Sequence, residues 1–507
     1  MPWIRLASFV SLLSLLLLPG PVSLAGTRAA PPAAPAEKGI AGKGIAWKPC
    51  PEDPWVQCGK VAVPVDWAHP AGAKIDLAVA RRPALKPRER IGSLFLLPGG
   101  PGDSGVDFAF YADLELDPEL LQRFDIIGFD ARGIGRSHPV TCPVDPDPVS
   151  EFPQDAKAYQ QLLRSHKDRA QECRRRSGPL FDHIDTRSVA RDADVVRGAL
   201  GERQISLHGE SYGTLLGQQY AEEYPGRIRA LVLDGNMDHS VTGARRYLLG
   251  GSTTLEEHYR KFAAWCNESS HCTLRGKNVF KVLDGLLARA DRGELKDPAG
   301  TAITSDELLE TVRRAMYAPN NNVGGWRPLA IYFTRLQARK SIQLPGWFPD
   351  SFQPIFCNDF SFPVRDFEHL KSLMAASRNA APHTRFNNLN WLSITGCQGF
   401  LPRASNPQHP YRIKGAPPIL LTNSRYDVST PYPDAQNVAR QIPGSVLLTY
   451  DGIGHRAYNR SACINAAVNR YLLTLRTPPP NTHCPAEPAP LTETPSKPNR
   501  HTPHWLW

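Results

Sequence analysis

The chain has 507 residues, of which 41% are hydrophobic and 9% aromatic, so it can form one large domain with insertions or two domains. The formal net charge is +10, but the basic residues are scattered, and their most concentrated run is only Arg174-Arg175-Arg176. A nucleic-acid-binding protein needs a longer basic stripe with interleaved aromatic residues. We therefore expect a solvated surface and no nucleic-acid partner.

The first 25 residues have the three parts of a secretory signal peptide. Arg5 precedes the apolar stretch Leu6–Leu18, and a small-x-small cleavage sequence follows at 23–25. A membrane anchor is the alternative, but the apolar stretch is too short to span a bilayer. We expect a signal peptide over 1–25, a disordered linker rich in Ala and Pro over 26–45, and an exported protein without a stable membrane anchor.

Ten cysteines fit an exported chain, because an even number in an oxidising compartment favours disulfides. Metal binding is the alternative, but the cysteines form no Cys-x-x-Cys pair and lie in no His-x-x-x-His cluster. We expect no metal and no cofactor. The simplest hypothesis pairs neighbours along the chain, as Cys50–Cys58, Cys142–Cys173, Cys266–Cys272, Cys357–Cys397 and Cys463–Cys484.

Alternating strands and helices are predicted in the first half of the chain. Strands at 56–65 and 74–80 make a hairpin-like start, and the pattern between about 150 and 200 is helical. Further strands are predicted at 93–97, 124–130, 204–208 and 229–235. This alternation predicts an α/β fold with a doubly wound, mostly parallel sheet, whose first part covers 46–236.

The alternation stops after Gly235, and residues 237–355 have a mostly helical pattern. The clearest helix covers 304–316 and begins with a capping box. We expect this segment to be a helical lid above the strand ends. The segment from Cys357 to Cys397 belongs either to the lid or to the chain that returns to the core.

Core strands resume in the last quarter of the chain. They are predicted at 418–423 and 445–450, and a helix from about 461 to 475 follows them. We therefore expect the second part of the core to cover 356–484 and a Pro-rich tail to cover 485–507.

A Gly-x-Ser-x-Gly sequence at 209–213 stands between a predicted strand and a helical pattern. A sharp strand-to-helix turn leaves Ser211 pointing out of the fold, and it needs glycines because a Cβ would collide with the neighbouring strand or helix. A chance match in a loop is the alternative. The context favours Ser211 as a nucleophile.

Ser211, Asp427 and His455 occur in the order nucleophile, acid, histidine, each just after a predicted core strand. The carboxyl ends of parallel strands meet at one edge of the sheet, so these side chains can converge there. Serine needs an imidazole to take its proton, and a buried carboxylate holds that imidazole in the required tautomer. Separately, Asp427 could be a turn residue and His455 a loop cap.

Glycines dominate the loop at 98–105, which follows a predicted strand. Its spacing is not that of a dinucleotide-binding loop. An ordinary turn is the alternative, but the backbone amides of Gly100 and Tyr212 are the best candidates for an oxyanion hole, because one lies in this loop and the other follows the nucleophile.

Four motifs of this chain occur together in one known group. They are Pro98-Gly99-Gly100-Pro101-Gly102, Asp130-x-Arg132-Gly133-x-Gly135-x-Ser137, Gly209-Glu210-Ser211-Tyr212-Gly213 and Gly454-His455. With them the chain resembles the prolyl and tripeptidyl aminopeptidase group of α/β-hydrolases, and 418–484 resembles the tripeptidyl aminopeptidase-like C-terminal region of secreted bacterial members. Two positions depart from the pattern. Pro98 replaces the His of prolyl aminopeptidases, and Arg456 stands where tripeptidyl-type proteins often have Gly.

The resemblance implies an α/β-hydrolase fold and release of short peptides from substrate N-termini through an acyl-enzyme. Such an exopeptidase needs an anion for the substrate's ammonium, and Glu210, Glu256 and Glu257 are candidates, although each could be an ordinary surface or packing residue. The expected partner is a peptide or a small acyl substrate. An esterase with the same triad is the alternative within enzymes, and an inactive secreted binding protein is the alternative outside them.

Overall fold

The computed structural model describes residues 44–143, 149–297, 299–319, 325–338 and 351–487. The expected signal peptide lies outside the described residues, as do most of the expected linker and most of the Pro-rich tail. The chain divides into a unit Met1–Gly39, outside the described residues, and a second unit Ile40–Trp507 that holds every element below.

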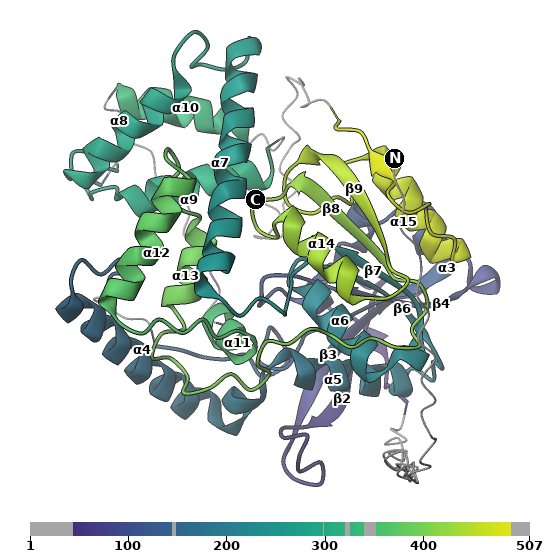
Figure 1. Ribbon diagram of the computed structural model, residues 1–507. Coiled ribbons are helices and arrows are strands. Elements are labelled where there is room, and N and C mark those ends of the chain that lie inside the picture. The colour runs from purple at the N-terminus through teal and green to yellow at the C-terminus, as the bar shows by residue number, and fades with distance from the viewer. Residues whose placement is uncertain (1–43, 144–148, 298, 320–324, 339–350, 488–507) are drawn as a thin grey trace, which may run out of the picture. The chain divides into compact units, whose positions relative to one another are not determined.

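A ten-stranded sheet forms the centre of the second unit (Figure 1). Its order is β1-β2-β3-β5-β4-β6-β7-β8-β9-β10. The strands are β1 (Lys48–Pro49), β2 (Gln57–Pro64), β3 (Lys74–Arg82), β4 (Gly92–Leu97), β5 (Phe124–Phe129), β6 (Ile205–Glu210), β7 (Ile228–Asp234), β8 (Leu420–Tyr426), β9 (Val446–Ile453) and β10 (His483–Cys484). The first three strands pair antiparallel, β3 meets β5 antiparallel, and all later pairs are parallel. The sheet is therefore mostly parallel, as the sequence predicts.

Helices cover both faces of the parallel strands, and for this reason β4, β5 and β6 are buried along their whole length. Side chains of β4 alternate between two cores. Phe95 and Leu97 join the core under α5 (Thr186–Ala199) and α6 (Gly213–Glu223), whereas Leu94 and Leu96 join the core under α3 (Pro118–Arg123) and α15 (Ala462–Thr474). The period of two in the strand thus places each residue on its face.

The remaining helices of the sheet region are short or peripheral. They are α1 (Gly105–Phe110), α2 (Ala112–Glu115), α4 (Ala156–Ser177) and α14 (Tyr432–Gln441). The 3-10 turns are η1 (Pro87–Glu89), η2 (Gly178–His183) and η3 (Pro225–Arg227). Of these elements α1 matters most for function, because it begins directly after the Gly-rich loop that follows β4.

All the named elements of the described chain between β7 and β8 are helices. They are α7 (Ala244–Glu268), α8 (Val279–Asp291), α9 (Ser305–Tyr317), α10 (Trp326–Gln337), α11 (Phe352–Asp359), α12 (Phe367–Ala380) and α13 (Asn388–Thr395). Figure 1 shows them grouped together. The capping box predicted for α9 is present, because Thr304 and Glu307 satisfy each other's backbone N–H groups.

The helical insertion continues past the boundary expected at residue 355. Both α12 and α13 contact α7, and α13 also contacts α9. In α12 the buried residues Leu370, Leu373 and Ser377 recur at helical spacing, so this helix packs as a member of the same group. Cys357 and Cys397 therefore lie within the helical insertion and precede the return to the core at β8.

Five disulfides join the same neighbours that the simplest pairing hypothesis names. They are Cys50–Cys58, Cys142–Cys173, Cys266–Cys272, Cys357–Cys397 and Cys463–Cys484. Among the helices of the described ranges, none has the length and apolar character needed to cross a membrane.

Candidate active site

Ser211 occupies a tight turn between β6 and α6. Its φ is +55°, in the left-handed region that residues other than glycine rarely adopt. A Cβ on Gly213 would lie 2.0 Å from the Leu97 carbonyl oxygen, and a Cβ on Gly209 would lie 2.6 Å from the Gly213 carbonyl oxygen. Only glycine fits at both positions, so strand, turn and helix can pack closely enough to present the serine at the strand end.

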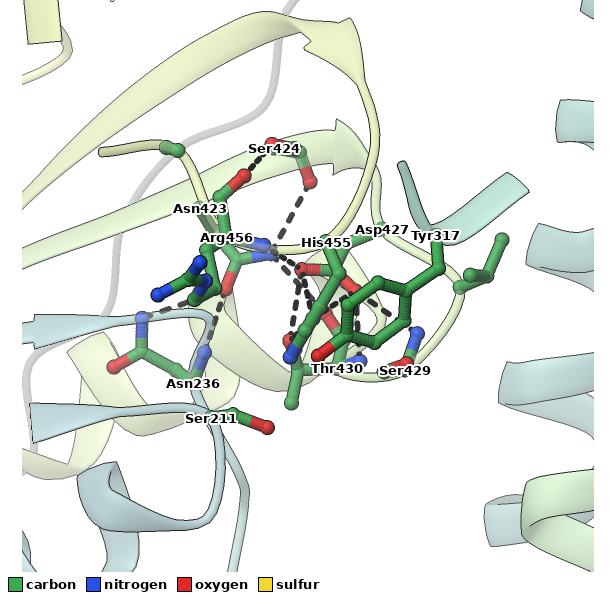
Figure 2. Close-up of polar contacts among 12 residues, drawn as sticks. Ser211, Asn236, Tyr317, Asn423, Ser424, Asp427, Ser429, Thr430, His455 and Arg456 are labelled. Carbon is green, nitrogen blue, oxygen red and sulfur yellow. Dashed lines mark hydrogen bonds and ion pairs between the residues drawn. The ribbon is translucent and has the colours of Figure 1, made fainter. Parts of the chain in front are cut away.

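Asp427 and His455 form a fully buried pair at the same sheet edge (Figure 2). His455 Nδ1 lies 2.8 Å from Asp427 Oδ1 and 2.9 Å from Oδ2. Burial opposes ionisation of Asp427, but the His455 imidazole and the backbone N–H groups of Thr430 and Ser429 hold its pKa below the usual value. The carboxylate is thus ionised and orients the imidazole.

The second ring nitrogen of His455 is available for Ser211. His455 Nε2 is buried and has no hydrogen-bond partner among the described residues. Figure 2 shows Ser211 near the imidazole, with no hydrogen bond drawn between the two side chains. Catalytic hydrogen bonds are often long before a substrate binds, so this geometry is compatible with proton transfer from Ser211.

Two backbone N–H groups beside Ser211 are free to donate. Within the described chain, neither Gly100 N–H nor Tyr212 N–H donates a hydrogen bond. The loop lies close to the nucleophile, because a Cβ on Gly99 would be 3.2 Å from Ser211 Oγ. The Gly-rich loop is therefore next to the serine, and neither of the two expected oxyanion-hole amides is engaged within the described chain.

A pocket of about 50 Å³ is lined in part by Ser211. The core contributes Gly100, Asp103 and Ser211 to its lining, and α9 of the insertion contributes Arg313 and Tyr317. Arg313 Nη1 is buried and has no hydrogen-bond partner among the described residues. The pocket thus combines the candidate nucleophile with charged groups from both parts of the unit.

The three glutamates expected to bind an ammonium group have other surroundings. Glu210 lines the pocket but forms an ion pair with Arg456. Glu256 is buried inside the insertion, where its carboxylate accepts hydrogen bonds from Thr384 N–H and Oγ1–H, both at 3.0 Å. Glu257 is exposed on α7. Neither Glu256 nor Glu257 is among the described residues that line the pocket.

Comparison with known proteins identifies the family. The alpha/beta hydrolase fold family matches residues 92–458. The chain is 30% identical to serine protease Hip1 of Mycobacterium tuberculosis, over 87% of this chain and 91% of that protein. It is also 30% identical to tripeptidyl aminopeptidase of Streptomyces lividans, over 86% of this chain and 85% of that protein. Carboxylesterase B of Mycobacterium tuberculosis is 31% identical, over 84% of this chain and 86% of that protein.

The chain belongs to the alpha/beta hydrolase family. It is a serine hydrolase, since relatives named as a serine protease and a tripeptidyl aminopeptidase match most of its length. This agrees with the fold and the enzyme class predicted from the sequence.

Asp130, the first residue of the motif Asp130-x-Arg132, supports the Gly-rich loop of this hydrolase. Asp130 accepts hydrogen bonds from Ser104 Oγ–H at 2.5 Å and from Val106 N–H at 3.1 Å, which fixes the end of the loop. Arg132 is fully buried, and its guanidinium pairs with Asp192 at 2.6 Å. Both residues hold backbone in place and lie beside the candidate site rather than in its chemistry.

The hydrolase insertion also fixes the residue that follows the nucleophile, a contact that the sequence did not indicate. Tyr212 O–H donates to Asp359 Oδ2 at 2.6 Å, and Thr186 Oγ1–H donates to the same oxygen at 2.6 Å. Asp359 is the last residue of α11 and is fully buried. Burial, and next the charge of Asp185, raises the pKa of Asp359 to about 7.

Tyr317 joins the insertion to the histidine loop of the hydrolase (Figure 2). Its ring centroid lies 4.5 Å from that of His455. The carbonyl oxygen of Tyr317 accepts a hydrogen bond from His455 N–H at 2.9 Å and another from Arg460 Nη2 at 3.0 Å. The end of α9 therefore helps to position the imidazole.

Proposed function

We propose that this serine hydrolase is a peptidase that releases short peptides from the N-termini of its substrates through an acyl-enzyme at Ser211. The observation that carries the proposal is the buried Asp427–His455 pair, whose Nε2 has no hydrogen-bond partner among the described residues. The pair lies at the same sheet edge as Ser211, and the backbone N–H groups of Gly100 and Tyr212 donate no hydrogen bond within the described chain. Similarity to tripeptidyl aminopeptidase over 86% of the chain supports a peptide substrate.

In the proposed reaction, His455 Nε2 takes the Ser211 proton while Oγ attacks the scissile carbonyl carbon. The Gly100 and Tyr212 N–H groups donate to the carbonyl oxygen as it becomes negative. The C–N bond then breaks, and the leaving amine takes the proton from His455. Water, deprotonated by the same imidazole, hydrolyses the acyl-enzyme and restores Ser211. Asp427 keeps the imidazole oriented throughout.

Two features of the pocket support cleavage near a chain end. Residues of the insertion, among them Tyr317, Phe352 and Leu389, line the pocket together with Ser211. Arg313 also lines it, and its unpartnered Nη1 is a donor suited to a peptide carbonyl oxygen. We propose that the insertion acts as a lid that admits only short or unfolded chain ends.

A pair of peptide amides that differ only in N-acetylation tests the proposal. We expect kcat/KM for the free-amine substrate to exceed that for the acetylated one by at least about 10-fold, because a charge-assisted contact contributes roughly 1.5–3 kcal/mol. Ser211→Ala is the control, and it should reduce kcat by about 10⁴-fold or more and abolish labelling by a fluorophosphonate. Equal cleavage of both substrates by the wild type would contradict an exopeptidase.

A carboxylesterase acting on small acyl esters is the second candidate, because Carboxylesterase B is 31% identical and the same three residues serve ester hydrolysis. Turnover of p-nitrophenyl esters without turnover of any peptide amide would favour it. If a fluorophosphonate failed to label Ser211, an inactive binding protein would be the better description.

We also propose that the protein is exported and that residues 1–25 are its signal peptide. Five disulfides in the described chain support an oxidising compartment. Protein recovered from the culture medium should begin at Gly26, which N-terminal sequencing measures.

A further inference from the structure

The charged side chains that line the pocket are not all paired. Four charged side chains take part, namely Asp103, Glu210, Arg313 and Arg456. Glu210 pairs with Arg456, and Arg313 pairs with Glu310 at 2.7 Å. The carboxylate of Asp103 accepts no hydrogen bond and forms no ion pair with any described residue. Asp103 is therefore the charged side chain of the pocket lining that has no ion-pair partner among the described residues.

Asp103 lies next to the candidate oxyanion hole. It belongs to the loop between β4 and α1, and its Cγ is 3.5 Å from the position of a Cβ on Gly100. Asp103 shares the pocket lining with Tyr317 of the insertion. Burial, followed by the charges of Asp103 and Asp427, raises the pKa of Tyr317. The carboxylate thus lies beside Gly100 and in the same pocket as Tyr317, whose ring packs on His455.

The surroundings of Asp103 favour a cation. The residue is half-buried, and burial raises the pKa of its carboxyl to about 6, although Arg456 acts in the opposite direction. The guanidinium of Arg456 is already bound to Glu210. A half-buried carboxylate without a partner is partly desolvated, so a bound cation would stabilise it.

We propose that Asp103 binds the free N-terminal ammonium of the substrate, which rests on the exopeptidase function proposed above. An ammonium carries three donors and a carboxylate only acceptors, so the two groups form short charge-assisted hydrogen bonds. Because Asp103 adjoins Gly100, only a short chain fits between the ammonium and the scissile carbonyl. Each extended residue spans about 3.3–3.6 Å, so the acyl part between the two groups is short.

The position of Asp103 also links amine binding to the reaction rate. An unpaired carboxylate near Gly100 repels the negative charge that develops on the carbonyl oxygen, whereas a bound ammonium neutralises that carboxylate. A substrate with a blocked amine therefore loses binding and also meets this repulsion. We expect N-acetylation to lower kcat as well as to raise KM.

Three variants test the proposal on the full-length enzyme with the same pair of amides and with p-nitrophenyl acetate. Asp103→Asn should lower kcat/KM for the free-amine substrate by 10- to 100-fold, and should leave or raise the rates on the acetylated amide and the ester. Asp103→Glu keeps the charge and should retain more of the free-amine preference than Asp103→Asn. Asp107→Asn is the matched control, because Asp107 lies on α1 and pairs with Arg136 at 2.9 Å instead of lining the pocket; it should behave as the wild type.

The outcomes separate this proposal from the function on which it rests. If the wild type prefers the free amine and Asp103→Asn keeps that preference in full, another group binds the ammonium and the proposal is overturned. If the wild type has no preference, the exopeptidase function itself is overturned. Fluorophosphonate labelling of Ser211 at the wild-type rate shows that Asp103→Asn retains a folded site. If Asp103→Asn is no longer labelled, Asp103→Glu decides, provided that it is labelled. If Asp103→Glu cleaves the free-amine and the acetylated amide equally well, the proposal is overturned.

Discussion

Arg456 connects the loop that carries Ser211 with the loop that carries His455. It follows His455 in sequence, and its guanidinium is bound to Glu210, which precedes Ser211. Its backbone has a φ of +66°, where a side chain costs roughly 1–2 kcal/mol relative to the usual helical region. Arg456 thus forms the ion pair while its backbone is strained. A glycine at this position would have neither the strain nor the ion pair.

We predict that Arg456→Gly and Arg456→Ala differ in stability although both remove the same ion pair. Both variants leave Glu210, which is 5% exposed, without its cation. Only alanine retains a Cβ at positive φ, so Arg456→Ala should be less stable than Arg456→Gly by about 1 kcal/mol. Urea unfolding at one pH measures the difference. Adding Glu210→Gln to Arg456→Gly should recover part of the loss, and equal stability of the two single variants would contradict the role of the backbone.

The surroundings of some site residues could be predicted from the sequence, and those of others could not. Ser211, Asp427 and His455 each follow a core strand, and the parallel sheet brings such positions to one edge, so their proximity could be anticipated. Glu256 could not be placed, because a helical acid faces solvent, core or pocket according to packing. Asp103 could not be singled out from the sequence, because its lack of a hydrogen-bond or ion-pair partner appears only in the folded pocket.

At the scale of elements, α11 and the turn between β6 and α6 are joined by one buried network around Asp359. Thr186 N–H, Asn406 Nδ2 and Tyr212 O–H all donate to its carboxyl group. The network fixes the Tyr212 side chain, and so also the Tyr212 N–H proposed for the oxyanion hole. The insertion therefore supports the candidate site through the last residue of α11.

We predict that the contribution of Asp359 to the free energy of unfolding depends on pH. Its pKa is about 7 in the folded protein and 3.8 as the ordinary value, so between pH 4 and 7 the folded state holds a proton that the unfolded state has lost. The free energy of unfolding of the wild type should therefore fall as pH rises through this window. Asp359→Asn resembles the protonated acid, so its free energy of unfolding should not fall through the loss of this proton. Relative to the wild type it should gain up to about 4 kcal/mol between pH 4 and pH 7.

Denaturant unfolding of both proteins at several pH values measures this difference. A constant difference from pH 4 to pH 7 would contradict the raised pKa of Asp359. Asp107→Asn is a suitable control, because Asp107 is half-exposed and pairs with Arg136 away from the network.

Elements of the core were more predictable than those of the insertion. The strands at β4 to β9 have buried apolar runs or alternation, and each begins and ends within a few residues of its expected limits. Sequence does not indicate where an all-helical insertion stops, because α12 and α13 differ from core helices only in what they pack against. Their contacts with α7 and α9, which are distant in sequence, decide the matter.

At the scale of the whole molecule, the disulfides close loops of very different length. Cys357–Cys397 spans 40 residues within the insertion, whereas Cys266–Cys272 spans 6. A cross-link stabilises chiefly by restricting the unfolded chain, and the restriction grows with the length of the loop. The two bonds should therefore contribute unequally to stability.

We predict that replacing both cysteines of Cys357–Cys397 by serine lowers the free energy of unfolding by about 4 kcal/mol, against about 2 kcal/mol for Cys266–Cys272. Urea unfolding of the two double variants beside the wild type measures both losses. The opposite order would mean that native packing around each bond outweighs loop length.

The position of the insertion has a consequence for how the protein is made. The sheet is interrupted after β7, and β8, its neighbour, begins only at Leu420. At ribosomal rates of about 5–20 residues per second, the intervening chain takes roughly 10 to 40 s to synthesise. During that interval the edge of β7 has no partner strand, and an unpaired edge can pair with another chain. The edge of β7 is therefore open to pairing with another chain until β8, which leads to Asp427, has been added.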